Sequence, residues 1–292
     1  MAIFKGSCVA LITPFTETGV DYDKLKELIE WHISEGTDSI LTCGTTGEAT
    51  TMTSDEKKEV IKFTIAIVNK RVPIMVGTGS NNTMETIKMS QYAESCGADS
   101  ILVITPYYNK TNKIGLYKHF EAVNNSVNIP IVLYNVPSRT NMNITTSDLV
   151  ELSKLSNIKA IKEASGNISQ IAEMSAVCGD TIEIYSGNDD QAIPVLSVGG
   201  LGVISVAANI IPSTMSKMVH MYLDGDTTGA MKLQLEYLEL CNKLFIETNP
   251  IPVKTAASLM GKCDSTMRLP LYDLDPKAKD VLVDCMKKYK LI

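Results

Sequence analysis

Histidine is scarce in this chain, which has only three among its 292 residues. His32, His119 and His220 lie far apart, and none has the paired helical spacing or the neighbouring Cys-x-x-Cys pattern that holds zinc or iron. The sequence therefore gives little support for a metal site, and we expect none. His32 falls in a helical pattern, so we expect it to be packed or capped rather than functional.

Long apolar runs are also missing. No stretch approaches the roughly 20 apolar residues that a membrane-spanning helix needs, although 45% of the residues are hydrophobic. The apolar start from Cys8 to Ile12 is short, lacks a small-residue cleavage pattern and runs into Pro14. We interpret it as a first strand, and we expect no membrane partner.

Blocks of basic residues are absent as well, and the net charge is −6. Binding to a phosphate backbone depends on such blocks to displace counterions, so we expect no nucleic-acid partner. The seven cysteines are odd in number and far apart, and most have apolar neighbours. This usage favours reduced core thiols in a cytoplasmic protein.

Short runs rich in β-branched residues recur along most of the chain. They are CVALIT, SILTC, PIMVG, SILVIT, PIVLYNV, IKAIKEA, TIEIYSG and GVISV. Amphipathic stretches separate most of these runs, and in the first stretch Leu25, Leu28, Ile29 and Ile33 share one helical face. Continuous apolar strands must be covered on both faces, and right-handed crossovers make such strands parallel. The pattern predicts an α/β fold, a TIM (β/α)8 barrel with a C-terminal helical extension.

The helical extension begins where the strand runs stop. We expect a catalytic barrel over residues 1–225 and a helical region over residues 226–292, broken at Asn249-Pro250-Ile251-Pro252. A last helix is expected to start at Pro276, with Asp275 as its N-cap. The rival fold is a doubly wound open sheet, which usually has a glycine-rich fingerprint after its first strand. Here Pro-Phe-Thr follows CVALIT instead.

Lys162 is the most informative single residue, because active sites of TIM barrels lie at the C-terminal ends of the strands. Strand alternation places Ile158, Ala160 and Lys162 on one face and Lys159 on the other. If that face is the barrel interior, burial disfavours the ammonium and yields the free amine that attacks a ketone. The alternative is that Lys162 pairs with a carboxylate such as Glu163 or reaches outward. The first interpretation predicts carbonyl chemistry through a Schiff base, with no metal and no organic cofactor.

Polar residues at other strand ends can face the same space. Tyr134 offers a phenol as a proton shuttle, although core packing is the commoner role of a strand tyrosine. Thr45 and Thr46 lie between two glycines and offer hydroxyls and backbone N–H groups to a carboxylate, although glycine-rich loops are common. Arg139 follows a proline-containing turn and suits a second carboxylate, with a surface ion pair as the alternative.

Seven motifs, in order along nearly the whole chain, closely resemble the dihydrodipicolinate synthase family of pyruvate-dependent class I aldolases. They are GTTGE from Gly44, TPYYNK from Thr105, YNVPSRT from Tyr134, IKEASG from Ile161, SGNDD from Ser186, GVISV from Gly202 and NPIPVK from Asn249. The resemblance implies a lyase that condenses pyruvate with L-aspartate 4-semialdehyde to 4-hydroxy-tetrahydrodipicolinate, the first committed step toward diaminopimelate and lysine. It also implies a homotetramer built from two tight dimers.

The resemblance also assigns catalytic roles. Lys162 carries the pyruvate as an imine, which acts as an electron sink, and Tyr134 donates and accepts protons. Thr45 and Tyr108 complete the proton relay, with Tyr108 supplied by a neighbouring subunit.

Four further residues are assigned to substrate binding on the same grounds. Thr46 and Ile204 hold the pyruvate carboxylate, and Arg139 receives the carboxylate of the semialdehyde. Gly187 lines the pocket through its backbone. The sequence departs from the family at Asn141, where a glycine is usual after SRT, so the shape of that loop is open.

A second departure concerns regulation. Lysine-inhibited members carry histidines in the stretch from Ala49 to Lys57, whereas this chain has Ser54 and Lys57. A cationic Lys57 repels lysine, so we expect weak or absent lysine feedback although Asn81, Glu85 and Tyr107 remain.

Three alternative functions stay open. A sister pyruvate-lysine aldolase, such as N-acetylneuraminate lyase or a keto-deoxy-sugar aldolase, shares the barrel, the lysine and the tyrosine, but Arg139 suits a small amino-acid carboxylate better than a sugar. A catalytically dead barrel that binds a metabolite would have no need of Lys162, Tyr134, Thr45 and Tyr108 together. A metal-dependent aldolase lacks ligands, because the chain has so few histidines.

Overall fold

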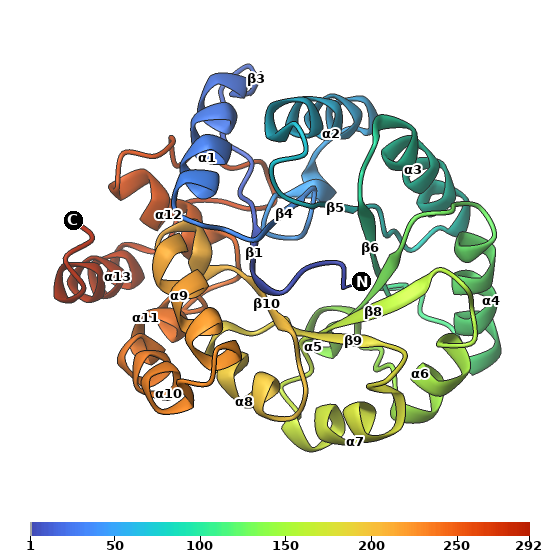
Figure 1. The fold of residues 1–292 in the computed structure, drawn as a ribbon. Helices are drawn as coiled ribbons and strands as arrows, with labels where there is room; N and C mark the ends of the chain where they lie inside the picture. Colours follow the sequence, from blue (N-terminus) through green and yellow to red (C-terminus); the bar gives the residue numbers. More distant parts are fainter. Residues whose placement is uncertain (1) are drawn as a thin grey trace.

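The centre of the molecule is a closed barrel of eight parallel strands, seen along its axis in Figure 1. The computed structural model describes residues 2–292. The barrel strands are β1 (Gly6–Ala10), β4 (Ser39–Thr42), β5 (Ile74–Gly77), β6 (Ser100–Ile104), β7 (Ile131–Asn135), β8 (Ile158–Glu163), β9 (Glu183–Ser186) and β10 (Gly202–Ser205). Strand β1 pairs with both β4 and β10, which closes the ring. Each β-branched run of the sequence supplies one strand, so the predicted TIM barrel is confirmed.

Helices surround the barrel on all sides (Figure 1). Those that connect or follow the strands are α1 (Tyr22–Ser34), α2 (Ser54–Val68), α3 (Thr83–Cys96), α4 (Lys113–Asn124), α5 (Pro137–Thr140), α6 (Thr146–Leu152), α7 (Ile168–Cys178), α8 (Ala192–Ser197) and α9 (Pro212–Leu223). Three 3₁₀ turns, η1 (Ala49–Thr51), η2 (Asp189–Gln191) and η3 (Ala207–Asn209), and a small hairpin of β2 (Phe15–Thr16) and β3 (Gly19–Val20) complete the barrel region. The sequence pattern did not indicate this hairpin, because two-residue strands are too short to show an alternation.

The chain after α9 is helical, as expected. It forms α10 (Thr227–Glu236), α11 (Leu238–Lys243), α12 (Ile251–Leu259) and α13 (Pro276–Lys288), which gather on the flank of the barrel beside α9 (Figure 1). Helix α10 is attached to the barrel through Gln234, which accepts from the Ile193 amide and donates to the Asp189 carbonyl. None of the helices in residues 2–292 is long and apolar enough to cross a membrane.

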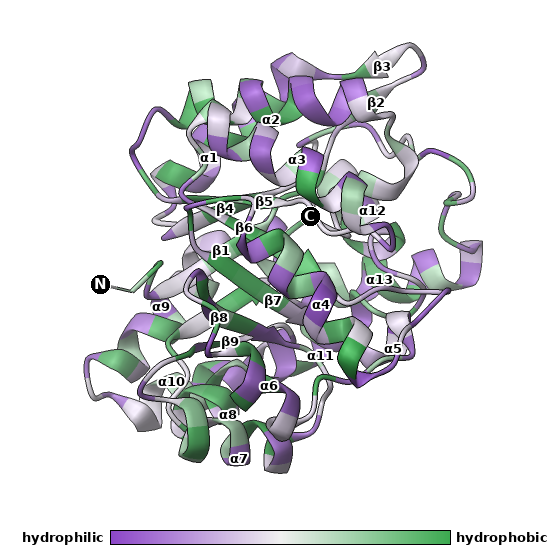
Figure 2. Cartoon of the chain, turned by 90° about the vertical axis from the view of Figure 1, so that its right-hand side faces the viewer, coloured by the Kyte–Doolittle hydropathy of each residue, from purple (hydrophilic) through white to green (hydrophobic). Residues whose placement is uncertain are grey.

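The hydrophobic core has two layers, because successive strand residues point to opposite sides of the sheet. Inside the barrel, each strand contributes residues to one compact cluster that includes Leu41, Val132 and Ile204. A much larger cluster lies between the strands and the helices. Figure 2 shows the same arrangement, with hydrophobic residues along strands such as β7 and hydrophilic ones on the outer faces of the helices.

One predicted face assignment is wrong. Ile158 belongs to the outer core layer with Ile161, whereas Ala160 lies in the barrel interior. The cause is a register shift between β7 and β8, in which Ile131 pairs with Ile158 but the next residue pairs with Ala160. Such a bulge inserts one extra residue and reverses the alternation before it. Lys162 lies beyond the bulge and keeps its predicted inward direction.

Side-chain hydrogen bonds cap the starts of α2 and α13. Thr53 and Glu56 form a reciprocal capping box at the start of α2. Asp275 accepts hydrogen bonds from two amides of the first turn of α13, which begins at Pro276 as predicted. These helix starts depend on neighbours within a few residues, which explains why sequence alone specifies them.

His32 is packed inside the core, as expected, and its burial predicts a pH dependence of stability. The imidazole is fully buried, and Nε2 has no hydrogen-bond partner within the described chain. Burial, assisted by the charge of Lys262, lowers the pKa of His32 to about 3. The unfolded chain binds this proton near its ordinary pKa of about 6.5. The neutral histidine therefore contributes stability that is present above pH 6.5 and is lost as the pH falls toward 3.

Between pH 7 and pH 5 the wild-type chain is expected to lose about 2 kcal/mol more stability than His32→Gln. Urea unfolding at the two pH values measures this difference. All other titrating groups are shared by the two proteins, so equal losses would contradict the assignment to His32.

Candidate active site

A cavity of about 340 Å³ opens at the C-terminal ends of the barrel strands. Its wall combines strand residues, residues of the loops that follow the strands, and four residues from the connection between α11 and α12, namely Phe245, Glu247, Thr248 and Asn249. Thr45, Thr46, Tyr134, Arg139, Lys162 and Gly187 are among the lining residues. Six of the eight residues singled out from the sequence are therefore brought together. Its ionisable lining residues with acidic or basic side chains are Lys162, Arg139 and Glu247.

Lys162 reaches the cavity from the barrel interior. Its side chain is 5% exposed, and Nζ lies 4.5 Å from the centre of the Tyr134 ring. The two residues are register partners on the neighbouring strands β8 and β7. No ion pair or hydrogen bond holds Nζ within residues 2–292. An amine so placed, buried and unpaired beside a phenol, is suited to attack a bound carbonyl carbon.

The alternative pairing of Lys162 with Glu163 is not found. Glu163 points to the opposite face of β8, where its carboxylate accepts from Asn135 Nδ2 at 2.9 Å and from the Ser165 amide at 2.7 Å. Burial raises the pKa of Glu163, and these hydrogen bonds oppose that shift. The carboxylate belongs to a polar cluster in the outer layer and is separated from the cavity by the strand.

Thr45 and Thr46 form a turn directly after β4. The Glu48 amide donates to the Thr45 carbonyl at 3.0 Å, and Thr13 Oγ1 donates to the Gly47 carbonyl at 2.7 Å. Asn249 Nδ2 donates to Thr46 Oγ1 at 3.0 Å. Because the Thr46 hydroxyl accepts this bond, its proton remains available for an anionic ligand.

Arg139 extends from α5 at the mouth of the cavity. Its Nη2 donates to the Asn249 carbonyl at 2.9 Å, and the guanidinium has no carboxylate partner within the described residues. The surface ion pair proposed as the alternative is therefore not present. Asn141, the departure from the family pattern, ends α5 in the left-handed region at φ 52°. Asparagine tolerates this conformation better than most residues, so the turn forms without glycine.

Glycine is required at position 187, because the backbone there lies close to atoms of Ala164 and Lys162. A Cβ atom at this position would lie 2.7 Å from Cβ of Ala164 and 3.2 Å from Cε of Lys162. A larger residue would therefore press on the reactive lysine as well as fill the cavity.

Two residues singled out from the sequence do not line the cavity of this chain. Ile204 is fully buried in the barrel interior on β10, and Val206 lines the cavity instead. Tyr108 is 91% exposed at the end of β6, with φ 69°. Its neighbour Tyr107 lines a smaller hollow of about 70 Å³ that also contacts Thr45 and Tyr134.

Sequence reasoning missed the contribution of the segment before α12. Four of its residues, among them Asn249, line the cavity, and Asn249 contacts both Thr46 and Arg139. The only signal was NPIPVK, whose resemblance to the family does not specify which loops it meets. More than a hundred residues separate Asn249 from either partner, and no local pattern encodes such a contact.

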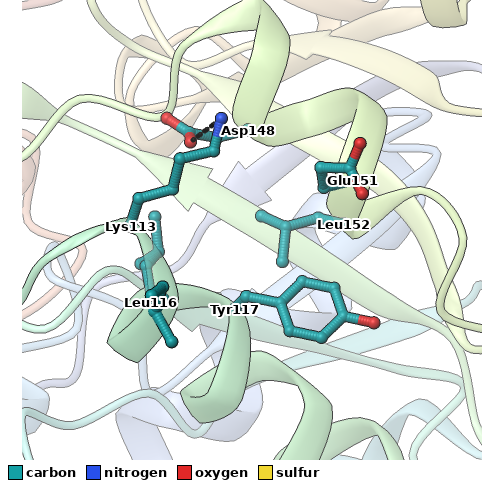
Figure 3. A pocket seen from close by; sticks show the side chains of 7 residues that line it. Lys113, Leu116, Tyr117, Asp148, Glu151 and Leu152 are labelled. Atoms are coloured by element: carbon teal, nitrogen blue, oxygen red, sulfur yellow. Dashed lines mark ion pairs between the residues drawn. The ribbon is translucent and has the colours of Figure 1, made fainter.

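Another pocket, between α4 and α6, has no set of reactive side chains directed at a common point (Figure 3). Leu116, Tyr117 and Leu152 form its wall, and its Lys113 and Asp148 pair with each other at 3.6 Å. No group of three or more His, Cys, Asp or Glu side chains that could hold a metal ion occurs between residues 2 and 292. The cavity around Lys162 is thus the candidate active site.

Comparison with known proteins identifies the family of the chain. The model of the dihydrodipicolinate synthetase family matches residues 3–289. A relative from Clostridium novyi, named 4-hydroxy-tetrahydrodipicolinate synthase, is 57% identical over 289 residues, which cover 99% of this chain and 98% of the relative. The crystal structure of dihydrodipicolinate synthase from Aquifex aeolicus matches with a TM-score of 0.97 and 43% identity, covering 99% of both chains.

A further solved structure is the chloride-inhibited dihydrodipicolinate synthase from Acinetobacter baumannii complexed with pyruvate. It matches with a TM-score of 0.97 and 41% identity and covers 99% of both chains. Family model, sequence identity and fold all extend over nearly the whole chain. The chain therefore belongs to the dihydrodipicolinate synthetase family.

Proposed function

We propose that this protein is a 4-hydroxy-tetrahydrodipicolinate synthase, a lyase that joins pyruvate to L-aspartate 4-semialdehyde. The observation that carries the proposal is the buried, unpaired Lys162 amine beside Tyr134 in a cavity that Arg139 also lines. Two carboxylates enter with the two substrates, and the cavity offers a cationic or hydroxyl group to each. The names of the relatives support the same activity.

The chemistry begins at the ketone of pyruvate. The Lys162 amine adds to the carbonyl carbon, water leaves, and an imine forms. A methyl proton is then lost, and the electron pair of the resulting enamine forms a carbon–carbon bond with the aldehyde carbon of the second substrate. The aldehyde oxygen gains a proton. The amine of the semialdehyde finally adds to the imine carbon and displaces Lys162, so the enzyme is regenerated and one water has been released overall.

Proton transfer is assigned to Tyr134, with Thr45 and Tyr108 completing the relay. Tyr134 lies next to the position of the imine, since its ring contacts Lys162 Nζ. Tyr108 is exposed and outside the cavity of its own chain, so we assign it to the cavity of a neighbouring copy in a homotetramer. Sedimentation velocity tests the assembly, and a single species at the 31.8 kDa of one chain would contradict it.

Substrate binding is assigned to the remaining four residues. Thr46 donates its free hydroxyl proton to the pyruvate carboxylate, and Gly187 leaves room for the imine. Ile204 is kept with Thr46 as the resemblance implies, although its side chain is buried in the barrel interior and does not line the cavity in this structure. Arg139 receives the carboxylate of the semialdehyde. We propose that no metal or organic cofactor takes part, because the imine itself supplies the electron sink. The seven free cysteines support a cytoplasmic location.

A paired assay tests the activity. Purified protein is given pyruvate with either L-aspartate 4-semialdehyde or N-acetylmannosamine, and the consumption of pyruvate is followed in each. We expect consumption only with the semialdehyde, because the guanidinium of Arg139 at the cavity wall matches its carboxylate, whereas N-acetylmannosamine has no carboxylate to bind there. Consumption only with the sugar would assign the chain to the sister aldolases, and no consumption with either would favour a metabolite-binding barrel.

A further inference from the structure

A second lysine, Lys254 of α12, is fully buried and does not line the cavity. Its Nζ lies 2.5 Å from Oε1 of Glu48, and both side chains are 0% exposed. The two buried lysines of the described chain therefore have opposite environments. Lys162 faces the cavity without a partner, whereas Lys254 is neutralised by a carboxylate and is closed off from ligands.

A buried ion pair is weak evidence for stability, because the desolvation of both charges offsets their attraction. Apolar residues of similar volume often serve equally well in such a place. An ion pair does constrain the positions of its two residues, because each charge must lie within reach of the other. The question is therefore which part of the molecule this pair holds in place.

Glu48 ends the turn that carries Thr45 and Thr46. Its amide donates to the Thr45 carbonyl at 3.0 Å, and its backbone is in the left-handed region at φ 55°. Residues with a Cβ atom rarely adopt this conformation unless the surroundings hold them there. Both carboxylate oxygens of Glu48 are held, one by Lys254 and the other by the Arg268 amide at 3.2 Å. The side chain thus fixes the residue whose N–H group closes the turn.

The ion pair is enclosed by a wider charge network. Lys254 Nζ and Arg268 Cζ lie 4.2 Å and 4.3 Å from the centre of the buried Phe15 ring. Arg268 also binds Glu56 of α2 through two hydrogen bonds of 2.7 Å and 2.6 Å. Two cations and two carboxylates balance each other, and the network connects the turn after β4 to the C-terminal helices.

Helix α12 and the residues before it contact the turn at a second point. Asn249, which lines the cavity, donates to the Thr46 hydroxyl, and Lys254 lies in the first turn of α12 that follows. The same segment therefore orients the Thr46 side chain directly, and it orients the Thr45 carbonyl through Glu48.

We propose that the Glu48–Lys254 ion pair positions the Thr45–Thr46 turn to receive the carboxylate of pyruvate, although neither residue touches the substrate. The identity of the ligand as pyruvate rests on the proposed function. The role of the ion pair in holding the turn does not depend on it. Lys254 of α12 is then a positioning residue. It is buried behind the cavity wall and affects the reaction by holding the turn in place.

The test compares variants that remove one charge or both. Glu48→Gln and Lys254→Met each leave a buried charge without its partner and are expected to lower the thermal midpoint, whereas the double variant is expected to recover much of that loss. In the double variant the KM for pyruvate is expected to rise about tenfold, with a smaller change in kcat, because the turn is no longer held in register. Amide hydrogen exchange at residues 44–48, without substrate, is expected to become about tenfold faster.

Glu30→Gln is the matched control, because it removes an exposed ion pair between Glu30 of α1 and Arg71 in the connection from α2 to β5. It is expected to leave both readouts unchanged. A double variant with a recovered midpoint, wild-type KM and wild-type exchange would show that the pair is only structural and would overturn the proposal.

A failure of the proposed function can be distinguished from a failure of the positioning role. If wild-type protein forms no adduct with pyruvate, the proposed function fails, while hydrogen exchange at residues 44–48 still decides the positioning role. If the double variant does not fold, Glu48→Asp replaces it, since the shorter carboxylate keeps its charge but no longer reaches Lys254 without moving the turn. Unchanged exchange in Glu48→Asp would then contradict the proposal.

Discussion

Lys162→Arg is expected to lose at least about a thousandfold in turnover while the protein stays folded. Arginine supplies a positive charge and a side chain at least as long as that of lysine, so it still reaches the Tyr134 ring that Lys162 contacts. It cannot give up its proton to become a nucleophilic amine, so no imine with pyruvate forms. The variant therefore separates the covalent role of the lysine from any contribution of its charge.

Reductive trapping measures the same step directly. Borohydride added with pyruvate is expected to leave wild-type protein with one reduced adduct, which peptide mapping assigns to Lys162. Lys159→Arg is the matched control, because Lys159 lies on the same strand with an exposed side chain, and it is expected to behave as wild type. An adduct on another lysine, or turnover retained in Lys162→Arg, would remove the basis of the proposed mechanism.

The barrel and its central lysine follow from the sequence because both depend on local periodicity. Eight apolar runs mark eight strands, and alternation within β8 directs Lys162 inward. The one wrong assignment, Ile158, comes from a bulge that alternation cannot reveal. A bulge depends on the pairing between two strands, so the sequence of a single strand does not indicate it.

The cavity wall follows only in part from the sequence. Strand ends identify Thr45, Tyr134 and Arg139, because every parallel strand of a barrel points to the same rim. The contact of Asn249 with Thr46 depends instead on where α12 packs. The pairing of Glu48 with Lys254 has the same origin, since a glutamate in a glycine-rich loop has no reason of its own to be buried.

Arg139→Met is expected to raise the KM for L-aspartate 4-semialdehyde about a hundredfold, and Arg139→Lys about tenfold. The guanidinium presents a rigid fork to a carboxylate, whereas an ammonium acts as one point charge. One donor of the fork is held by the Asn249 carbonyl at 2.9 Å, so the remaining donors are oriented before the substrate arrives. Formation of the pyruvate adduct is expected to stay within about twofold of wild type, because Arg139 is assigned to the second substrate only.

Steady-state kinetics with each substrate varied in turn, together with borohydride trapping, distinguishes the two binding steps. Arg71→Lys serves as the control, since that arginine is already paired with Glu30 at 2.6 Å and does not line the cavity. If the adduct with pyruvate fell while the KM for the semialdehyde stayed constant, Arg139 would belong to the ketoacid. The two carboxylate sites would then have to be exchanged, and the Thr45–Thr46 turn would receive the aldehyde substrate instead.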